Sequence, residues 1–418
     1  MSQVADRPPD AKVSFRTIAK DPLVAPIIVI VFVLLAGLGL VFPVLPLFAR
    51  SFGVGNDGAG LFLGTFGFAR LFGDLIGGSI VDRRGERWTA IVGMTFLGVC
   101  CVVTGAAPNF PVALIGWGLA GIGSAIIFAS LFSYILKAAP EDRVARTLSF
   151  FYGAFNVGVI AGGAAGGLIA SSFGLRAPLF GYALVLLVGI VTYARLVPVL
   201  PAVEAKETTT AETEAATAEA PRPSAGIVRE LLAIPGLPTT LFLSLTYLWV
   251  VAGIFNTLVP LFATDELGMS TGAIGATFAV GVAAEFLVLF PAGTLADRHG
   301  RKAVMLPSLL GLVIVAAVLG TSSSPVMLTL LLAALAMFSG FAGVPPAAML
   351  SDLVPPEHSG RAVGAFRFLG DIGFFLAPLI TGWTSKNFGF VEAFAVTAAV
   401  PAIAFVLTLR MPETLRPA

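Results

Sequence analysis

Residues 78–87 read GSIVDRRGER, and residues 293–302 read GTLADRHGRK. Both stretches fit the pattern G-x-x-x-D-R-x-G-x-[RK], and one lies in each half of the chain. Each is a charged turn between two long apolar stretches, although only 12% of the residues in the chain are charged. A shorter repeat, PLFA, occurs at 46–49 and again at 260–263, with almost the same spacing. The repeats indicate two duplicated halves that keep the same charged turn.

The composition is that of a membrane protein. Hydrophobic residues make up 57% of the 418 residues, whereas soluble domains average about 45–50% apolar and about 25% charged residues. An apolar run of about 20 residues is long enough to cross the ~30 Å hydrocarbon core as a helix. The runs here are longer than barrel strands and do not alternate between polar and apolar residues. The predicted fold class is therefore an all-α membrane protein.

Twelve apolar segments divide the chain into two groups of six. Between the groups, residues 203–224 are rich in Ala, Thr, Glu and Pro and cannot form a packed core. We predict a tail (1–22), a six-helix bundle (23–198), a low-complexity linker (199–230), a second six-helix bundle (231–410) and a second tail (411–418). The expected spans are 23–48, 57–81, 88–107, 110–137, 144–172, 177–197, 237–264, 271–296, 302–321, 325–351, 360–386 and 390–409.

Positive charge is unevenly distributed between the two sides of these helices. Of the 25 Lys and Arg residues, 20 fall on the side of the tails, the linker and the charged turns. Arg50, Arg176 and Lys386 fall on the other side, and Arg70 and Arg367 lie within spans. Loops rich in Lys and Arg remain in the cytoplasm. We therefore expect a multi-pass protein of the plasma membrane, most simply a bacterial inner membrane, with both termini cytoplasmic.

Several classes of function are disfavoured by what the sequence lacks. The net charge of +1 gives no basis for binding nucleic acid, and the absence of any Gly-Lys pair excludes a P-loop. Cys100 and Cys101 are adjacent in an apolar run without a nearby His, which does not suit a metal site. We expect no cofactor, no metal and no enzymatic activity. A receptor or scaffold would need a large surface outside the membrane, which the mostly short loops do not offer.

Twelve spans, the six-plus-six division and the two charged turns resemble the major facilitator superfamily over essentially the whole chain. The fifth span reads GVIAGGAAGG (158–167) and is similar to G-x-x-x-G-P-x-x-G-G of the drug:proton antiporter branch. Its matching residues are Gly158, Gly162, Gly166 and Gly167, and Gly163 stands where that branch has proline. Pro378, in the eleventh span, occupies the equivalent position of the second half. The resemblance implies two pseudo-symmetric six-helix bundles, and the small residues favour close packing of spans 5 and 8, with generic small-residue packing as the alternative.

The resemblance also implies that the charged turns are conformational switches. The residues concerned are Gly78, Asp82, Arg83, Gly85, Gly293, Asp297, Arg298 and Gly300. A carboxylate in such a turn can accept hydrogen bonds from the N-terminus of a neighbouring helix and so favour one arrangement of the halves. For Asp82 the implied partner is the eleventh span.

Charged residues within spans are candidate functional residues, because ionisable groups are costly in the bilayer. With a helical rise of about 1.5 Å per residue, Arg70 and Asp371 share the midplane, and Asp74 and Arg367 share a level nearer the cytoplasm. We predict two ion pairs, Arg70–Asp371 and Asp74–Arg367, that latch the halves on the cytoplasmic side and open when the protein faces inward. The alternative is an i,i+4 pair within each helix.

Glu285 also lies near the midplane but has no cation in its own helix. We expect neutral Asn156 to be its neighbour. A buried carboxylate without a cation binds a proton more readily than one in water, so Glu285 is the first candidate for proton coupling. The alternatives are that Glu285 pairs with a loop or a bound cation, or that Arg70 across the cavity keeps Glu285 ionised, in which case Asp371 is the better candidate for the proton.

The spans contain few groups that could bind a polar solute. The only Asn residues within them are Asn156 and Asn256, and the sole Gln of the chain is Gln3. We therefore predict a monomeric secondary transporter that moves lipophilic or amphipathic small molecules across the bilayer, in proton-coupled efflux as in multidrug resistance. The alternative is a facilitator or proton symporter for a small organic anion or metabolite, with Arg70 binding the anion. Candidate cavity residues are Asn156, Asn256, Phe128, Phe132, Tyr247, Trp249, Phe255, Phe338 and Phe341, although most of the aromatic residues are expected to pack in the core.

Overall fold

The structure is a computed structural model that describes residues 23–138, 144–198, 233–355 and 359–415. The predicted linker (199–230) and N-terminal tail (1–22) lie outside these residues, as does the end of the C-terminal tail from residue 416. The described residues form helices and no strands. The first half contains α2 (Ala25–Val41), α3 (Leu45–Arg50), α4 (Asn56–Arg84), α5 (Glu86–Ala106), α6 (Phe110–Ala138), α7 (Val144–Phe173) and α8 (Ala177–Leu196).

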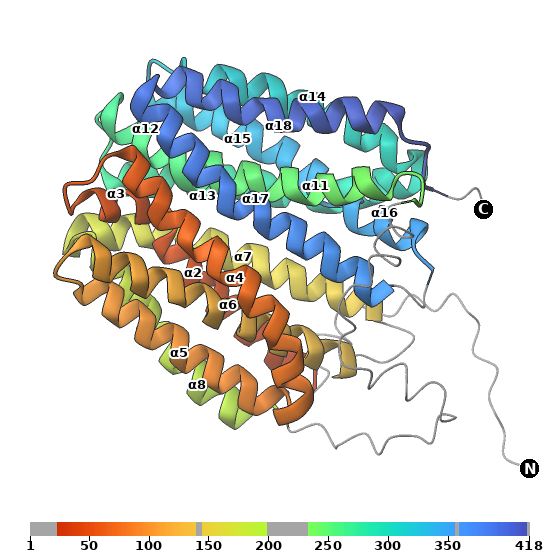
Figure 1. Ribbon diagram of the computed structural model, residues 1–418, viewed down its shortest axis with the longest axis horizontal. Coiled ribbons are helices and arrows are strands. Elements are labelled where there is room, and N and C mark those ends of the chain that lie inside the picture. Colours follow the sequence, from red (N-terminus) through yellow and green to blue (C-terminus); the bar gives the residue numbers. More distant parts are fainter. Residues whose placement is uncertain (1–22, 139–143, 199–232, 356–358, 416–418) are drawn as a thin grey trace, which may run out of the picture.

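The second half repeats this order of elements. It contains α11 (Leu237–Val250), the π-helix η2 (Val251–Leu258), α12 (Val259–Asp265), α13 (Thr271–His299), α14 (Arg301–Leu319), α15 (Pro325–Gly343), α16 (Pro345–Leu353), α17 (Ser359–Asn387) and α18 (Phe390–Arg410). Figure 1 shows the two halves side by side, the first coloured red to yellow-green and the second green to blue.

The helical segments correspond to the twelve predicted spans. Within the described residues, nine helices are long and apolar enough to cross a membrane. A tenth span is α4, which bends by 46° between residues 74 and 76. The remaining two spans contain shorter apolar stretches, which are Ala25–Val41 (α2) and Val157–Phe173 within α7. The all-α membrane fold predicted from composition is confirmed.

Glycine defines the turn between the second and third span of each half. Gly85 ends α4 with φ 77°, and Gly300 ends α13 with φ 102°. A residue with a Cβ atom rarely adopts this backbone conformation. The next helix starts at once, with Glu86 in the first half and Arg301 in the second. The repeated glycine of the sequence pattern therefore reverses the chain without a longer loop.

Two helix pairs make the most extensive contacts between the halves. α4 packs against α17, and α7 packs against α13. A Cβ atom at Gly60 would lie 2.1 Å from the carbonyl oxygen of Pro378, and one at Gly167 would lie 2.7 Å from the Cα atom of Gly275. Glycine thus allows the two backbones to touch at both contacts. Gly60 and Gly167 both lie towards the end of the bundle that carries α3 and α12. We call this the outer end, because the charge distribution predicts that it faces away from the cytoplasm, and the opposite end the inner end.

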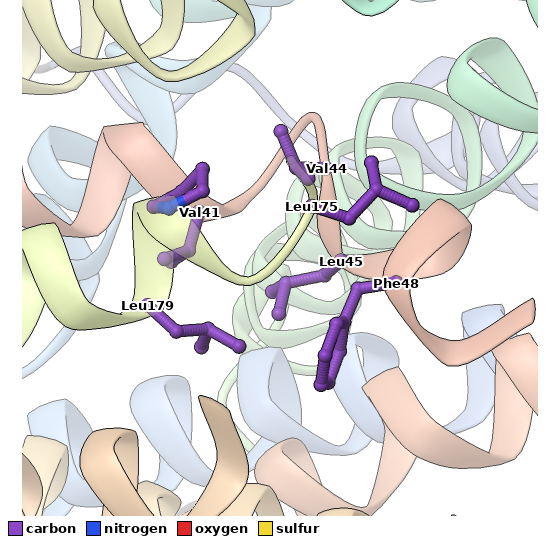
Figure 2. Close-up of a pocket in the computed structure, with 7 residues that line it drawn as sticks. Val41, Val44, Leu45, Phe48, Leu175 and Leu179 are labelled. Carbon is purple, nitrogen blue, oxygen red and sulfur yellow. The ribbon is translucent and has the colours of Figure 1, made fainter. Parts of the chain in front are cut away.

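The first span of each half is interrupted near the outer end. In the first half, α2 stops at Val41 and α3 starts at Leu45. In the second half, the π-helix η2 joins α11 to α12 at the corresponding place. Figure 2 shows the apolar crevice beside the first interruption, lined by residues such as Val41, Phe48 and Leu179. Its lining contains no charged side chain, so this crevice is a packing gap beside the interruption and offers no polar group to a ligand.

Candidate functional site

Four charged side chains meet where α4 of the first half crosses α17 of the second. Arg70 Nε lies 3.3 Å from Asp371 Oδ1, and Arg367 Nη2 donates a hydrogen bond of 2.9 Å to Asp74 Oδ1. Both ion pairs therefore cross between the halves, as their matched depths predict, and they are not i,i+4 pairs within one helix. Asp371 is buried, with only 3% of its side chain exposed. We refer to these four residues as the interface quartet.

An aromatic residue of α6 completes the surroundings of the quartet. The guanidinium of Arg367 lies over the ring of Phe128, 4.0 Å from the ring centroid, and Phe128 stacks on Phe132. A cation over an aromatic face is stabilised by the ring quadrupole, and more strongly where water is scarce. Because Phe128 belongs to the first half, this contact is a third link across the interface. Phe128 thus contributes to the site by binding a side chain of the protein.

Arg70 also borders a cavity within the first half. The cavity offers about 60 Å³ to small molecules, which is room for a few waters. Its lining is mostly aliphatic, with Arg70, Ser124 and Tyr182 as the polar members. The cavity is much smaller than the roughly 300–1,000 Å³ typical of ligand pockets. In this conformation it is therefore a solvent pocket beside the quartet and too small for a drug-sized molecule.

Glu285 lies apart from the quartet, within the second half. The hydroxyl of Tyr247 donates a hydrogen bond of 3.4 Å to Glu285 Oε1. Gly340 of α15 packs against Glu285, since a Cβ there would lie 3.1 Å from its Cγ atom. Among the described residues Glu285 has no ion-pair partner, and Arg70 is paired with Asp371 instead. Sequence reasoning placed Asn156 beside Glu285; the side chain of Asn156 lies outside the described part of the structure, and the pairing with Tyr247 was missed.

The other candidate cavity residues of the second half lie mainly in packed positions. Trp249 is buried and donates from Nε1 to the carbonyl oxygen of Thr397 at 3.2 Å. Phe255 is buried in the core, and Phe338 packs against Gly311 of α14. These rings stabilise the bundle, as sequence reasoning expected for most of the aromatic residues. Phe341 of α15 is half-buried.

Asn256 differs from these aromatic residues. It lies in the π-helix η2, is only 4% exposed, and its Nδ2 has no hydrogen-bond partner among the described residues. Short π-helical segments occur frequently at functional sites. A buried amide donor without a partner costs free energy, so Asn256 remains a candidate for contact with a bound molecule.

The glycine motif of α7 has two faces. Gly158, Gly162 and Gly166 pack against α2, and a Cβ at Gly162 would lie 2.0 Å from the carbonyl oxygen of Ala36. Gly163 and Gly167 instead face α13. The motif therefore brings α7 close to the first span of its own half as well as to span 8. Sequence reasoning named span 8 as the partner and kept generic small-residue packing as the alternative, without naming the first span.

Each charged turn contains an ion pair, and the positions of the acidic and basic residues are exchanged between the two turns. In the first half, Glu86 at the start of α5 pairs with Lys137 near the end of α6. In the second half, Arg301 at the start of α14 pairs with Asp352 of α16, 3.3 Å away, and also with Asp297. When the two copies of the repeat are aligned, Arg301 falls opposite Glu86 and Asp352 falls opposite Lys137. The pair has been retained in both halves with its charges exchanged.

This exchange makes the two aspartates of the turns different. Asp297 lies one helical turn before Arg301, which binds it. Asp82 lies one turn before Glu86 instead, and it is exposed and has no ion-pair or hydrogen-bond partner among the described residues. Gly78 has open space around it, and Arg83 and Arg298 are exposed. Among the described residues, therefore, Asp297 is bound in this conformation and Asp82 has no partner.

The last cation of each turn binds the end of the sixth span of its half. Arg87 donates to the carbonyl oxygen of Ala194 at the end of α8. Lys302 donates to the carbonyl oxygens of Leu409 and Met411 at the end of α18, at 2.8 and 2.9 Å. Carbonyls at a helix C-terminus lack intrahelical partners and carry partial negative charge. The final Arg or Lys of the sequence pattern is therefore a C-terminal cap, a role that sequence reasoning missed.

Glu413 of the C-terminal tail caps the second turn. Its carboxylate accepts from the backbone N–H of Arg301 at 2.9 Å and of Lys302 at 3.0 Å. The start of α5 has its own acidic residue, Glu86, whereas α14 begins with a cation. Glu413 thus supplies the negative charge that a helix N-terminus favours.

Two further ion pairs join the halves at the outer end. Arg50 Nη1 lies 2.6 Å from both carboxylate oxygens of Asp265, and Lys386 Nζ lies 2.7 Å from Asp57 Oδ2. Arg50 ends α3 and Asp265 ends α12, so the tips of the two interrupted spans are bound to each other. Sequence reasoning placed three cations on the outer side, Arg50, Arg176 and Lys386. Two of them, Arg50 and Lys386, form these ion pairs, so the few outer cations could have indicated where the halves are joined. Ion pairs therefore join the halves at the outer end and in the interface quartet at the same time.

Comparisons with known proteins agree on one family. The family model of the Major Facilitator Superfamily matches residues 27–284 and 241–418. An uncharacterised MFS-type transporter of Methanocaldococcus jannaschii is 22% identical over 90% of this chain and 95% of its own length. Multidrug resistance protein 2 of Bacillus subtilis is 22% identical over 84% of this chain and 86% of its own. The multidrug resistance protein MdtG of Citrobacter koseri is 35% identical, but the match spans 36% of this chain and 38% of that protein.

Solved structures share the fold. The nucleoside transporter NupG has a TM-score of 0.74 at 14% identity, covering 93% of this chain and 99% of the other. A bacterial homologue of the human lysosomal transporter Spinster, in an inward-facing and occupied conformation, has a TM-score of 0.72 at 16% identity, covering 92% and 95%. At these identities the likeness concerns the arrangement of helices alone.

Proposed function

Because the chain belongs to the Major Facilitator Superfamily and is a membrane transporter and not an enzyme, we propose that it exports lipophilic or amphipathic small molecules in exchange for protons. The poverty of polar groups in its spans supports an apolar cargo. The relatives described as multidrug resistance proteins support the same class of substrate. The two halves would alternate between outward and inward openings about the α4–α17 and α7–α13 contacts.

The proposed proton coupling rests on the surroundings of Glu285. It is a carboxyl group within a span, hydrogen-bonded by Tyr247 and without a cation partner in the described structure. Such a group is easily switched between charged and neutral forms, and the neutral form is tolerated in an apolar interior. Loading a proton from the outside and releasing it inside would drive the exchange, because substrate and proton compete for the same space and the protein carries one or the other.

The experiment is flux in proteoliposomes with an imposed pH gradient and a panel of hydrophobic dyes. Wild-type protein is expected to show dye movement and opposite proton movement in a constant ratio. Glu285→Gln, which mimics the protonated form, is expected to lose gradient-driven efflux and to retain dye exchange. Glu392→Gln, at the exposed start of α18, is the matched control and should behave as wild type.

The results separate the alternatives. A rate of dye efflux by wild-type protein that does not depend on the pH gradient would overturn the proton coupling. Transport of small organic anions in place of dyes would favour the symporter or facilitator and refute the proposed cargo. Unaltered gradient-driven efflux in Glu285→Gln would show that Glu285 does not carry the proton.

A further inference from the structure

Two carboxylate oxygens of the interface quartet have no hydrogen-bond donor. Asp74 and Asp371 each use Oδ1 to bind an arginine of the opposite helix. Their Oδ2 atoms are buried, and neither has a hydrogen-bond partner in the described part of the chain. The two carboxyl groups lie within hydrogen-bonding reach of each other. Two buried carboxyl groups from different halves are therefore neighbours, and no donor among the described residues binds either Oδ2 atom, while Arg70 Nε lies 3.3 Å from Asp371 Oδ1.

Such an arrangement is unfavourable if both carboxyl groups are ionised. Two carboxylates that share a site repel each other, and like charges about 3 Å apart do not both ionise. One proton between the two oxygens replaces the repulsion by an O–H···O⁻ hydrogen bond, which is among the stronger hydrogen bonds in proteins. The proton belongs to the pair, and neither aspartate titrates independently.

The groups around the pair hold the carboxyl groups in place without donating to the Oδ2 atoms. Arg70 and Arg367 bind the Oδ1 atoms from α4 and α17, Phe128 of α6 covers Arg367, and Tyr182 of α8 borders the cavity on the Arg70 side. The two arginines keep the pair from becoming an uncompensated negative charge. They also fix one edge of each carboxyl group and leave the Oδ2 atoms without a hydrogen-bond donor among the described residues.

We propose that Asp74 and Asp371 share one proton across the boundary between the halves, forming a proton-binding site that exists only while α4 and α17 are in contact. When the helices separate, the two carboxyl groups move apart. The hydrogen bond between them is then lost, and the proton is released. Binding a proton thus favours the contact. This inference deepens the proposed function and rests on it only for the statement that the proton moves during transport.

The test is infrared spectroscopy of the purified full-length protein, with no substrate or gradient. A protonated carboxyl group has a carbonyl stretch that a carboxylate lacks. Near neutral pH, wild-type protein is expected to show this band from the pair, and Asp74→Asn and Asp371→Asn are each expected to remove the same component. Glu266→Gln and Glu392→Gln, which change exposed carboxylates outside the quartet and outside the ion pairs that join the halves, are the matched controls and should leave it unchanged.

Conservative variants protect the test against loss of folding. Asp74→Glu and Asp371→Glu keep a carboxyl group at each position and should shift the band without removing it. A component that survives in both Asn variants would overturn the shared proton, and so would a component lost in only one of them. A band present in protein whose dye transport moves no protons would refute the proposed coupling and leave the shared proton standing, so the two failures are distinguishable.

Discussion

Breaking the outer ion pairs is expected to open the outer end of the bundle by a predictable amount. Exposed ion pairs contribute about 0.2–1 kcal/mol. Arg50 and Asp265 are 33% and 27% exposed and one nitrogen reaches both oxygens, so we take about 1 kcal/mol. Lys386 and Asp57 are more exposed, and about 0.5 kcal/mol is appropriate. Since about 1.4 kcal/mol is a factor of ten, losing both pairs should shift the open-to-closed ratio about tenfold.

The assay is the distribution of distances between spin labels on the α3 and α12 tips, measured in nanodiscs. Arg50→Gln with Lys386→Gln should move population to longer distances, and high salt should do so in wild-type protein because salt screens exposed charges. The exchange of charges in Arg50→Asp with Asp265→Arg should restore the closed population. Arg176→Gln is the control, because Arg176 binds a carbonyl oxygen of its own half. If the charge exchange restores nothing and salt has no effect, the ion pairs do not close this end.

Three other perturbations test the packing, the turns and the tail. Gly60→Leu is expected to force α4 away from α17, because its Cβ would lie 2.1 Å from the carbonyl oxygen of Pro378; an unchanged interhelical distance by the same spin-label method would contradict this. Asp82→Asn is expected to lower turnover with near-normal substrate binding. Asp297→Asn is expected to lower turnover by a smaller factor, because Asp297 is bound within its own half. Equal losses of turnover in the two variants would refute this difference between the aspartates. The pKa of Glu413 is lowered, because burial, which raises it, is outweighed by hydrogen bonds from backbone N–H groups. Its stabilisation is therefore present above about pH 4.5 and lost as the pH falls through the lowered value. Thermal melts of wild type and Glu413→Gln should differ at pH 7 and converge in acid, and a constant difference would contradict the role of the carboxylate.

The sequence by itself determined the features that depend on the solvent around each segment. Apolar runs become spans because a bilayer leaves the backbone no hydrogen-bond partner outside its own helix. The apolar composition of each segment therefore predicts that it spans the membrane, without knowledge of the rest of the fold. The internal repeat located the charged turns. Since the rise of a helix is constant, counting residues also placed Arg70 level with Asp371 and Asp74 level with Arg367.

Only the tertiary structure decided which faces of the helices meet. Counting gives the depth of a residue but not the rotation of its helix, so Tyr247 was not considered as a donor to Glu285. The exchanged polarity of the Glu86–Lys137 and Arg301–Asp352 pairs was visible in the aligned repeats, yet nothing local shows that α5 starts beside the end of α6. Contacts between side chains of different halves, such as Arg50 with Asp265, depend on how two whole bundles pack. That packing is a property of the assembled helices and has no local signature in the sequence.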